Sequence, residues 1–363
     1  MSSAHKVVIA AGGTGGHLYP AVALAKELTR RGCDVLFIVK DNELTRTSLQ
    51  KESLRFESVT AAPWVGQSPL RVLIGIPAMI GSVRDSMELL QRFGAERVVG
   101  FGAYVSVPVV LAARMLRIPI DVHEQNPSPG WANRLAALFA RRVAVSFPQT
   151  LERFGTKAVL TGNLVRQDLL GGDRAEALNR LGLQKHLKTI LVFGGSGGAK
   201  SINRAVADGL QKFIPLRDQV QFFHVSGSPD ETSALAKRYH ALDLIAAVRD
   251  YCHEMRLAYA AADLVVCRAG ATTISELLAL GLPSILVPYP YAGAHQDSNA
   301  RVAESLGAAR IVRESSSLSG DLTDAILTLA RSPQDLVSMR TACGRFPVDL
   351  RAAASKMADI VLL

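Results

Sequence analysis

The chain has 363 residues, of which 48% are hydrophobic and 20% charged, and it carries a formal net charge of +9 at pH 7. This composition is too apolar for a disordered protein, and the length suits two α/β domains of ordinary size. The four cysteines form no C-x-x-C pair and do not group with histidines at metal-ligand spacing, so we expect free thiols in a reducing compartment.

The N-terminal residues lack a cationic stretch followed by an apolar run and a cleavage site, so no secretory signal is expected. The longest uncharged run, residues 98–113, is broken by glycines and Pro108 and is shorter than the roughly 20 apolar residues that span a bilayer. We therefore expect a soluble protein, attached at most to a membrane surface. The positive charge suits phosphorylated ligands or an anionic membrane. Nucleic acid is not expected as a partner, because no recognition motif or aromatic-rich basic segment is present.

The first predicted unit is a strand at 6–11, a glycine-rich turn at 12–16 and a helix that ends near Gly32. The helix is indicated by Leu18, Val22, Ala25 and Leu28, which share one helical face. A second strand at 35–39 completes a βαβ unit.

The same arrangement recurs half a chain later. A strand at 189–193 leads into a glycine-rich turn at 194–198, followed by a helix predicted from Ile202 to Phe213. Further strand–loop–helix units begin at 97, at 118–122 and at 263–267. Alternating strands and helices predict two doubly wound domains with parallel sheets, joined by a linker around 162–173. A final helix at 347–363 can pack on either domain.

The glycine-rich turns match neither a dinucleotide fingerprint nor a P-loop. Glycines there let the backbone approach a ligand and aim free N–H groups at a negative charge beside a helix N-terminus. For one such turn alone, a tight strand-to-helix connection explains the glycines equally well. Two equivalent turns favour contact with a ligand. Thr14 and Ser196 add hydroxyl groups that suit an oxyanion or a helix cap.

An ordered set of motifs carries a more specific resemblance. They are Gly12-Gly-Thr-Gly-Gly-His-Leu-Tyr-Pro20, the stretches 100–108, 123–126, 162–166 and 194–199, and Cys267-Arg-Ala-Gly-Ala-Thr-Thr-Ile-Ser-Glu276. Together they span most of the chain and resemble the MurG family of bacterial glycosyltransferases. Three positions depart from the family's usual pattern, namely Ala103 for glycine, Leu164 for proline and His295 for glutamine.

The resemblance implies a GT-B fold, that is, two Rossmann-like domains facing a deep cleft. Residues 1–165 would bind the acceptor and the membrane, with the helix at 347–363 packing back on them, and residues 166–346 would bind the UDP-sugar. It also implies transfer of N-acetylglucosamine, with inversion, from UDP-N-acetylglucosamine to undecaprenyl-pyrophosphoryl-N-acetylmuramoyl-pentapeptide. The implied location is the cytoplasmic face of the inner membrane, as a peripheral protein.

Sugar transfer needs a base for the acceptor hydroxyl and stabilisation of the leaving diphosphate. His17, at the end of the first glycine-rich turn, is one candidate base, although it can equally hold the acceptor pyrophosphate or stabilise the loop. Glu124, after the strand predicted at 118–122, is the second. The chain contains no Asp-x-Asp motif, so we predict that amides and Arg or Thr side chains stabilise the diphosphate and that no metal or cofactor is required.

The resemblance assigns further residues to the donor. Thr273 and Glu276 would contact a phosphate and the ribose, although Thr273-Ile-Ser-Glu276 also fits a capping box. His295 and Gln296, expected in the loop after a strand at 284–287, would read sugar hydroxyls. The remaining donor residues are Thr14, Gly15, Gly16, Asn126, Arg166 near the hinge, Ser196, Cys252 through its backbone, Ala271 and Thr272.

On the acceptor side the motif positions are Tyr104, His123 and Asn133. The segment 69–84 is apolar, is flanked by Arg71 and Arg84 and is preceded by Trp64, so the region 64–84 suits an anionic membrane surface, although a buried helix explains most of the segment's residues. Two alternative functions are a UDP-N-acetylglucosamine 2-epimerase with two facing Rossmann-like domains and a nucleotide-sugar sensor without catalytic activity. The apolar, arginine-flanked segment and the polar cluster at 123–126 argue against the epimerase.

Overall fold

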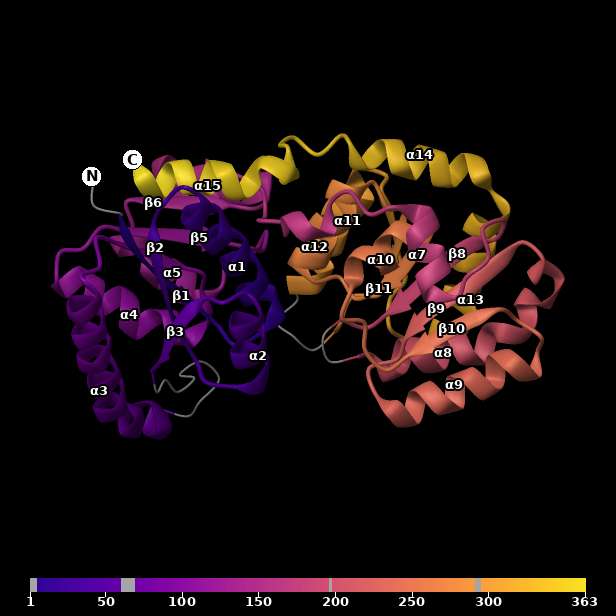
Figure 1. Cartoon of the computed structure of the whole chain (residues 1–363), viewed down its shortest axis with the longest axis horizontal. Helices are drawn as coiled ribbons and strands as arrows, with labels where there is room; N and C mark the ends of the chain where they lie inside the picture. The colour runs from indigo at the N-terminus through magenta and orange to yellow at the C-terminus, as the bar shows by residue number, and fades with distance from the viewer. Residues whose placement is uncertain (1–4, 60–68, 196–197, 291–294) are drawn as a thin grey trace. The chain divides into compact units, whose positions relative to one another are not determined.

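The computed structural model describes residues 5–59, 69–195, 198–290 and 295–363, with the backbone alone described for 69–75. The chain divides into two compact units (Figure 1). The first unit combines Met1–Arg166 with Val348–Leu363, and the second is Gln167–Pro347. Each is an α/β unit on a parallel sheet, which confirms the predicted fold class.

The described residues of the first unit form a seven-stranded sheet in the order β3-β2-β1-β4-β5-β6-β7, with every neighbouring pair parallel. The strands are β1 (Lys6–Ala11), β2 (Asp34–Val39), β3 (Arg55–Ser58), β4 (Arg97–Gly100), β5 (Ile120–Glu124), β6 (Arg142–Val145) and β7 (Ala158–Leu160). The strand predicted at 118–122 thus lies two residues later, because Pro119 precedes it and pairing with β4 begins at Ile120.

Helices cover both faces of this sheet. They are α1 (Gly15–Arg30), α2 (Glu43–Lys51), α3 (Pro69–Phe93), α4 (Ala103–Met115), α5 (Trp131–Phe139), α6 (Leu151–Phe154) and α15 (Ala353–Leu362), with 3₁₀ turns at Pro148–Thr150, Gly155–Lys157 and Leu350–Ala352. Along β1, Val7 and Ile9 pack with α1 and α15, whereas Val8 and Ala10 pack with α3, α4 and α5. Burial on both faces explains why the strand reads as an unbroken apolar run.

The second unit repeats the plan. Its described residues form a six-stranded parallel sheet in the order β10-β9-β8-β11-β12-β13. The strands are β8 (Lys188–Phe193), β9 (Val220–Val225), β10 (Ala246–Arg249), β11 (Leu264–Cys267), β12 (Ser284–Leu286) and β13 (Ala309–Ile311). In both sheets the strand order reverses beside the first strand, between β1 and β4 and between β8 and β11, where open α/β sheets bind ligands at the carboxyl ends of their strands.

The helices of the second unit are α7 (Arg174–Leu181), α8 (Lys200–Gly209), α9 (Pro229–Ala241), α10 (Met255–Ala261), α11 (Ala271–Leu280), α12 (His295–Ser305), α13 (Leu318–Arg331) and α14 (Pro333–Cys343), with 3₁₀ turns at Gln167–Leu169 and Leu210–Leu216. The helix predicted to reach Phe213 ends at Gly209. The chain continues there as a 3₁₀ turn that contains Pro215, whose ring cannot supply an N–H to a longer α-helix.

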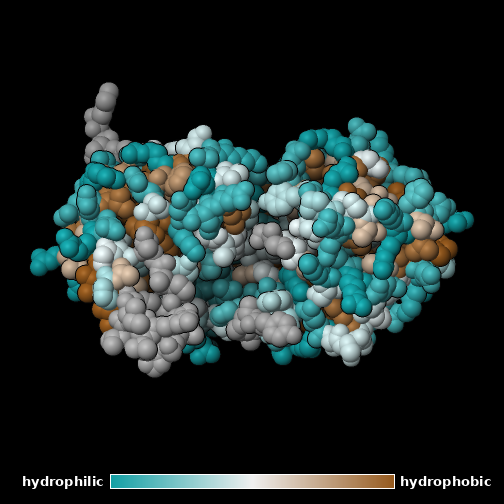
Figure 2. Space-filling model, turned by 90° about the horizontal axis from the view of Figure 1, so that it is seen from below, coloured by the Kyte–Doolittle hydropathy of each residue, from teal (hydrophilic) through white to brown (hydrophobic). Residues whose placement is uncertain are grey.

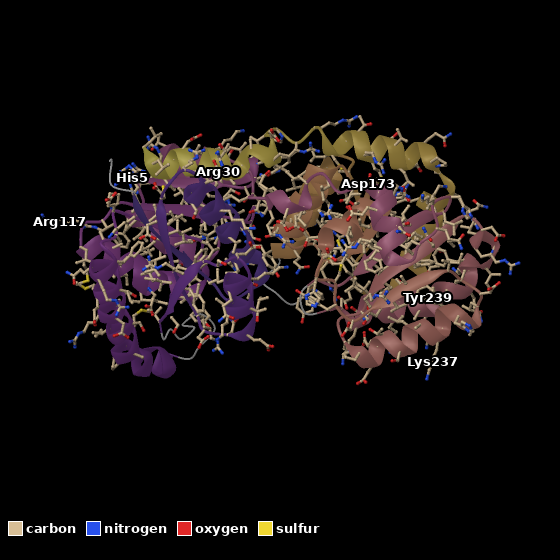
Figure 3. The ribbon with its side chains drawn as sticks, viewed as in Figure 1. His5, Arg30, Arg117, Asp173, Lys237 and Tyr239 are labelled. Carbon is tan, nitrogen blue, oxygen red and sulfur yellow. The ribbon has the colours of Figure 1, made fainter. Side chains whose placement is uncertain are left out.

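A polar network lies inside the second unit. On α9, Lys237 points outward, while Tyr239 is 2% exposed and points into the unit (Figure 3). His224 of β9 is fully buried; its Nδ1 lies 3.1 Å from the Tyr239 hydroxyl and its Nε2 lies 3.1 Å from Asn203 Oδ1. Asn203 also donates to the Ser226 carbonyl at 2.7 Å, so the network joins α8, β9 and α9.

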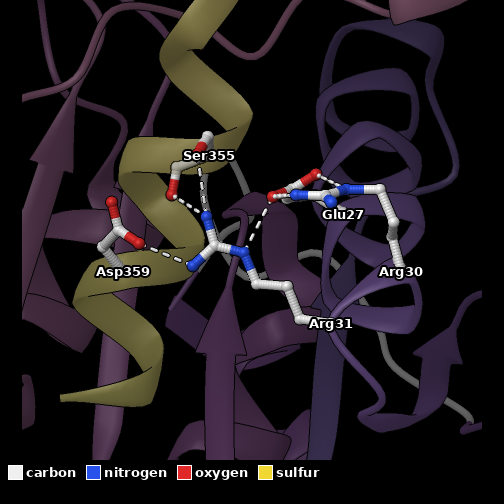
Figure 4. Close-up of polar contacts among 5 residues, drawn as sticks. All are labelled: Glu27, Arg30, Arg31, Ser355 and Asp359. Carbon is white, nitrogen blue, oxygen red and sulfur yellow. Dashed lines mark hydrogen bonds and ion pairs between the residues drawn. The ribbon is translucent and has the colours of Figure 1, made fainter.

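Arg31, just after α1, fixes the C-terminal helix to the first unit (Figure 4). Its guanidinium donates to Asp359 at 2.5 Å, to Ser355 Oγ at 2.7 Å and to Glu27 at 2.7 Å. The predicted helix at 347–363 is shorter in the structure, because a 3₁₀ turn precedes α15 at Leu350–Ala352. Hydrogen bonds from Arg30 and Arg31, opposed by burial, lower the pKa of Glu27 to about 2.

Replacement of Arg31 by alanine should destabilise the first unit by about 1–3 kcal/mol, because it removes hydrogen bonds to two residues of α15 and leaves Glu27 with one partner fewer. Chemical denaturation, followed by hydrogen exchange in α15, measures the effect. Arg30→Ala is the matched control, since Arg30 pairs with Glu27 alone among the described contacts and should leave exchange in α15 unchanged. Equal exchange in the two variants would contradict this role for Arg31.

Acid should weaken the second unit through His224. Burial lowers the pKa of His224 to about 3, from an ordinary value of 6.5. Between pH 6.5 and 3 the folded unit therefore binds fewer protons than the unfolded chain. The contribution of neutral His224 to the free energy of unfolding is complete above pH 6.5 and declines by about 1.4 kcal/mol per pH unit as the pH falls towards 3. Denaturant midpoints at pH 7.5 and 5.0 test this, with His224→Gln expected to show a smaller difference between the two pH values. An imidazole NMR titration of His224 near pH 6.5 would rule it out.

Candidate active site

The first glycine-rich turn connects β1 to α1. Thr14 occupies the N-cap position of α1, but its hydroxyl bonds no helix amide and instead lies 2.9 Å from Nδ1 of His17. The suggested capping role of the Thr14 side chain is therefore wrong. Gly15 and Gly16 are the first two residues of α1, and Gly16 is exposed at the helix start. The turn thus presents the Thr14–His17 pair beside a helix N-terminus, where negative charge is stabilised.

This turn packs against the loop that follows β4. A Cβ atom at Gly12 would lie 2.4 Å from Cβ of Ala103, so only glycine fits there. Ala103 has φ 57, in the left-handed region that favours glycine, which explains why glycine is the usual residue at this position. Next to it, Tyr104 is the second residue of α4, and Nζ of Lys40 lies 5.7 Å from its ring centroid. The side-chain hydrogen bond to Tyr104 raises the pKa of Lys40, so a cation stands beside the first turn.

His123 and Glu124 were expected in a polar loop after a strand, but they are the last residues of β5 and are 0% and 1% exposed. Gln125 donates to Nδ1 of His123 at 3.0 Å, which leaves Nε2 to donate to the Gly162 carbonyl at 3.4 Å. Burial, with a smaller repulsion from His17, lowers the pKa of His123 to about 4 despite the Gly162 bond. His123 is therefore a neutral ring that links β5 to the end of the first unit's main segment.

The Glu124 carboxylate organises the loop between β5 and α5. One oxygen accepts from the Asn126 amide at 2.8 Å and from its side chain at 3.2 Å. The other accepts from the Gly130 amide at 3.1 Å and from Nδ2 of Asn133 at 2.9 Å. Burial raises the pKa of Glu124, although all four hydrogen bonds oppose that shift. Glu124 thereby holds Asn126 and Asn133 in place together, and the amide oxygen of Asn133 is buried without a hydrogen-bond partner among the described residues.

Arg166, at the end of the main segment of the first unit, also reaches the α1 region. Its guanidinium centre lies 4.7 Å from the ring centroid of Tyr19, which is two residues beyond His17. The structure therefore brings Thr14, His17, Tyr104, Glu124 and Arg166 to elements at the carboxyl edge of one sheet.

In the second unit, the second glycine-rich turn leads to α8. Ser196 lies outside the described residues. A Cβ at Gly194 would meet backbone atoms of Gly198 and Ala199 at 2.1–2.2 Å, so only glycine fits at position 194. Cys252 lies in the loop between β10 and α10 and is partly buried, which raises its pKa.

The turn before α11 is a second helix N-terminus at the same edge. Ala271 and Thr272 are the first helical residues, and Gly270 occupies the N-cap position with no side-chain cap. The capping-box alternative for Thr273 and Glu276 does not hold, because the helix begins two residues before Thr273 and Glu276 Oε2 accepts from the Tyr259 hydroxyl at 2.8 Å. The N-cap residue of α11, Gly270, therefore supplies no side-chain cap to the first turn of the helix.

Arg268, directly after β11, joins several strand ends. Its guanidinium donates to Glu314 at 2.7 Å, to Ser201 Oγ at 2.8 Å and to the Val287 carbonyl at 3.1 Å, and it lies 5.2 Å from the ring centroid of Tyr289. Burial alone would raise the pKa of Glu314, but hydrogen bonds from Arg268 and Ser201 hold it below its ordinary value. The pair thus fixes the first turn of α8 against the ends of β12 and β13.

His295 and Gln296 were expected in a loop, but they are the first residues of α12. The side-chain oxygen Oε1 of Gln296 accepts from the backbone amides of Ala269 at 3.1 Å and Tyr289 at 2.9 Å. It therefore links the turn before α11 to the segment after β12. Nδ1 of His295 is buried without a hydrogen-bond partner among the described residues.

Sequence reasoning missed three residues of this arrangement, namely Lys40, Tyr259 and Arg268. Arg268 lies within a motif already singled out, so its place directly after a buried strand was a usable signal. Lys40 also ends a strand, but nothing in the sequence indicated its approach to Tyr104. Tyr259 sits in an apolar helix 17 residues before Glu276, and no periodic pattern indicated their contact.

The arrangement supplies, on each sheet, a helix N-terminus with hydroxyl and cationic groups nearby, which suits phosphorylated ligands. The part of the chain that the structure describes contains no group of three or more His, Cys, Asp or Glu side chains placed to hold a metal ion. No helix among the described residues has both the length and the apolar character needed to cross a membrane.

Comparison with known proteins places this chain in a family. Residues 7–145 match the glycosyltransferase family 28 N-terminal domain, and residues 189–360 match the glycosyltransferase family 28 C-terminal domain. A UDP-N-acetylglucosamine–N-acetylmuramyl-(pentapeptide) pyrophosphoryl-undecaprenol N-acetylglucosamine transferase of Desulforudis audaxviator is 40% identical over 348 residues, 93% of each chain. A protein of the same name from Halothermothrix orenii is 39% identical over 320 residues, which are 85% of this chain and 86% of the relative.

The solved structure of Acinetobacter baumannii MurG shares the fold along the whole length. It aligns with a TM-score of 0.77 and 28% sequence identity, covering 99% of each chain. The predicted GT-B fold is thereby confirmed. The chain belongs to glycosyltransferase family 28 and, within it, to the MurG family.

Proposed function

We propose that the protein transfers N-acetylglucosamine from UDP-N-acetylglucosamine to undecaprenyl-pyrophosphoryl-N-acetylmuramoyl-pentapeptide, with inversion at the anomeric carbon. The observation that carries this proposal is membership of the MurG family over most of the chain. In the reaction an acceptor hydroxyl oxygen bonds to the anomeric carbon and the bond to the diphosphate breaks. The hydroxyl proton passes to a base and UDP leaves with the bonding electron pair.

We assign the proton to His17 in preference to Glu124. Both oxygens of Glu124 already accept two hydrogen bonds each inside the protein, and the side chain is 1% exposed. A base needs a lone pair within hydrogen-bond reach of the acceptor hydroxyl. His17 is partly exposed and is oriented by Thr14. Glu124 then acts as a positioning residue for Asn126 and Asn133, and His123 supports the same strand end.

The first unit would bind the acceptor through Tyr104 and the unpartnered amide oxygen of Asn133. The second unit would bind the donor, with Thr273 and the first-turn amides of α11 at the diphosphate and Glu276 at the ribose. His295, whose Nδ1 is buried without a partner among the described residues, would accept from a sugar hydroxyl. The other donor assignments are Thr14, Gly15, Gly16, Asn126, Arg166, Ser196, Cys252, Ala271, Thr272 and Gln296.

We further propose that helix N-termini and glycine-rich turns stabilise the leaving diphosphate, so that no divalent ion is needed. Two turns that only glycine fits, at Gly12 and Gly194, lie beside helix starts, and the whole chain contains no Asp-x-Asp motif. Turnover in the presence of EDTA is the expected result.

His17→Ala should lower acceptor-dependent UDP release by about 10²- to 10⁴-fold, the range for loss of a general base, while UDP-N-acetylglucosamine binding stays intact. The assay contains the lipid-linked muramoyl-pentapeptide and EDTA, and His186→Ala, an exposed histidine of the second unit, is the control. Full turnover by His17→Ala would overturn the base assignment. Formation of UDP-N-acetylmannosamine from the donor alone would instead indicate an epimerase.

We also propose that the first unit attaches to an anionic membrane surface, at the cytoplasmic face of the inner membrane where a lipid-linked acceptor is reached. On α3, Ile76 and Ile80 are 39% and 57% exposed, and Arg84 is exposed one turn further on. Leu138 of α5 is 69% exposed. Hydrophobic side chains are visible on the surface of this unit in the space-filling view (Figure 2). Apolar side chains beside an arginine suit the boundary between acyl chains and anionic headgroups. Trp64 and Arg71, also predicted to take part, lie outside the described side chains.

Ile80→Asp should reduce binding to phosphatidylglycerol vesicles by about tenfold or more. The apolar side chain that would enter the bilayer is lost, and the carboxylate that replaces it is repelled by the anionic lipid. Vesicle sedimentation measures this. Val337→Asp is the control, since Val337 is similarly exposed, at 64%, but lies on α14 of the second unit. Equal losses in the two variants would contradict attachment through α3.

A further inference from the structure

A buried tyrosine holds the carboxylate that we assign to the donor ribose. Tyr259 lies on α10 and is 3% exposed, and its hydroxyl donates to Oε2 of Glu276 at 2.8 Å. Glu276 lies in the second turn of α11 and is 6% exposed. The two side chains come from different helices, so this hydrogen bond is a tertiary contact. It lets Tyr259 of α10 hold the carboxylate of Glu276 on α11.

The tyrosine ring is itself held in position. It makes a T-shaped contact with the ring of Phe193, the last residue of β8, with ring centroids 6.1 Å apart and an interplanar angle of 68°. The neighbouring residues Leu257, Ala258 and Ala261 on α10 are also buried. A phenol packed in this way has few alternative rotamers, so the hydroxyl is a fixed donor.

A fixed donor to one carboxylate oxygen restricts how the carboxylate can face a ligand. An ionised carboxylate has about four acceptor positions, and the phenol takes one of them. The remaining positions then have a set direction. A vicinal diol is recognised when both of its hydroxyls donate to a carboxylate whose plane is already oriented.

We propose that Tyr259 is a positioning residue that orients Glu276 for the ribose diol and thereby makes the enzyme select a ribonucleotide donor over its 2′-deoxy analogue. This inference rests on the proposed function, specifically on Glu276 as the ribose contact. A site built to hydrogen-bond a hydroxyl rejects the analogue that lacks it, because buried polar groups are then left unpaired.

The test compares kcat/KM for UDP-N-acetylglucosamine and for its 2′-deoxyuridine analogue in four proteins, namely the unmodified enzyme, Tyr259→Phe, Glu276→Ala and Tyr239→Phe. Tyr239→Phe is the matched control, because it removes an equally buried phenol hydroxyl in the same unit, which pairs with His224 and not with Glu276. The unmodified enzyme should prefer the ribonucleotide donor by about 10- to 100-fold, the range for a hydrogen bond to a charged group.

Tyr259→Phe should lower this preference by about three- to tenfold, through a higher KM for the ribonucleotide donor with kcat little changed, while Tyr239→Phe leaves the preference as it was. Calorimetric binding of UDP and 2′-deoxy-UDP gives the same ratio without turnover. The ratio of the two dissociation constants can therefore be measured even for a destabilised variant, after circular dichroism has given the fraction of protein that is folded.

The outcomes separate the two levels of the proposal. If Glu276→Ala keeps the full preference, the ribose assignment of Glu276 is wrong. If Glu276→Ala abolishes the preference but Tyr259→Phe retains it, the ribose assignment stands and the role of Tyr259 is overturned. A decrease in Tyr239→Phe equal to that in Tyr259→Phe would attribute the effect to general loosening of the unit and would also overturn it.

Discussion

The parallel pairing of every strand is the constraint on which the rest of this molecule depends. Because all strands of a sheet run in one direction, their carboxyl ends lie at one edge, and the helices that follow begin there with amides that have no partner within the helix. Helix N-termini of this kind can bind an anionic ligand through their backbone N–H groups. The two glycine-rich turns, after β1 and β8, occupy equivalent places in the two sheets, directly beside the point where strand order reverses. The site chemistry is thus a consequence of chain topology as well as of particular side chains.

Buried charges then give these edges their fixed shape. Glu124 and Arg268 each follow or end a central strand, and each forms several hydrogen bonds with loops from other strands. Glu124 accepts from four donors inside the protein, and Arg268 donates to Glu314, Ser201 and the Val287 carbonyl, so most of the hydrogen-bonding capacity of each side chain is used inside the protein. Removing one partner of such a group leaves an unsatisfied buried charge, which costs more than the bond contributed. The hydrogen bonds of both residues hold the neighbouring loops in place.

The sequence allowed the fold class and most strand positions to be predicted, because the strands are buried on both faces and read as apolar runs between glycines. Errors arose where a local pattern competed with a tertiary contact. Thr273 and Glu276 have capping-box spacing, but α11 starts earlier and Glu276 pairs with Tyr259 from another helix. His123 and Glu124 read as a polar turn, whereas they end a buried strand, because their partners are amides and side chains that no local pattern reveals. His295 and Gln296 begin a helix for a similar reason: the Gln296 side chain accepts from two distant amides. Motifs gave the candidate site residues, which stay a prediction, but no pattern in the sequence indicated their hydrogen-bond partners.

The segment that carries α15 belongs to the first unit, although the second unit separates it in sequence from the remainder of that unit. During synthesis, residues 348–363 leave the ribosome only after the second unit has been translated in full. Until then the nascent first unit exposes the apolar face that Met357, Ala358 and Val361 later cover. The second unit is continuous and can complete its fold earlier. The second unit can thus reach its final fold before the first, whose core includes residues of α15.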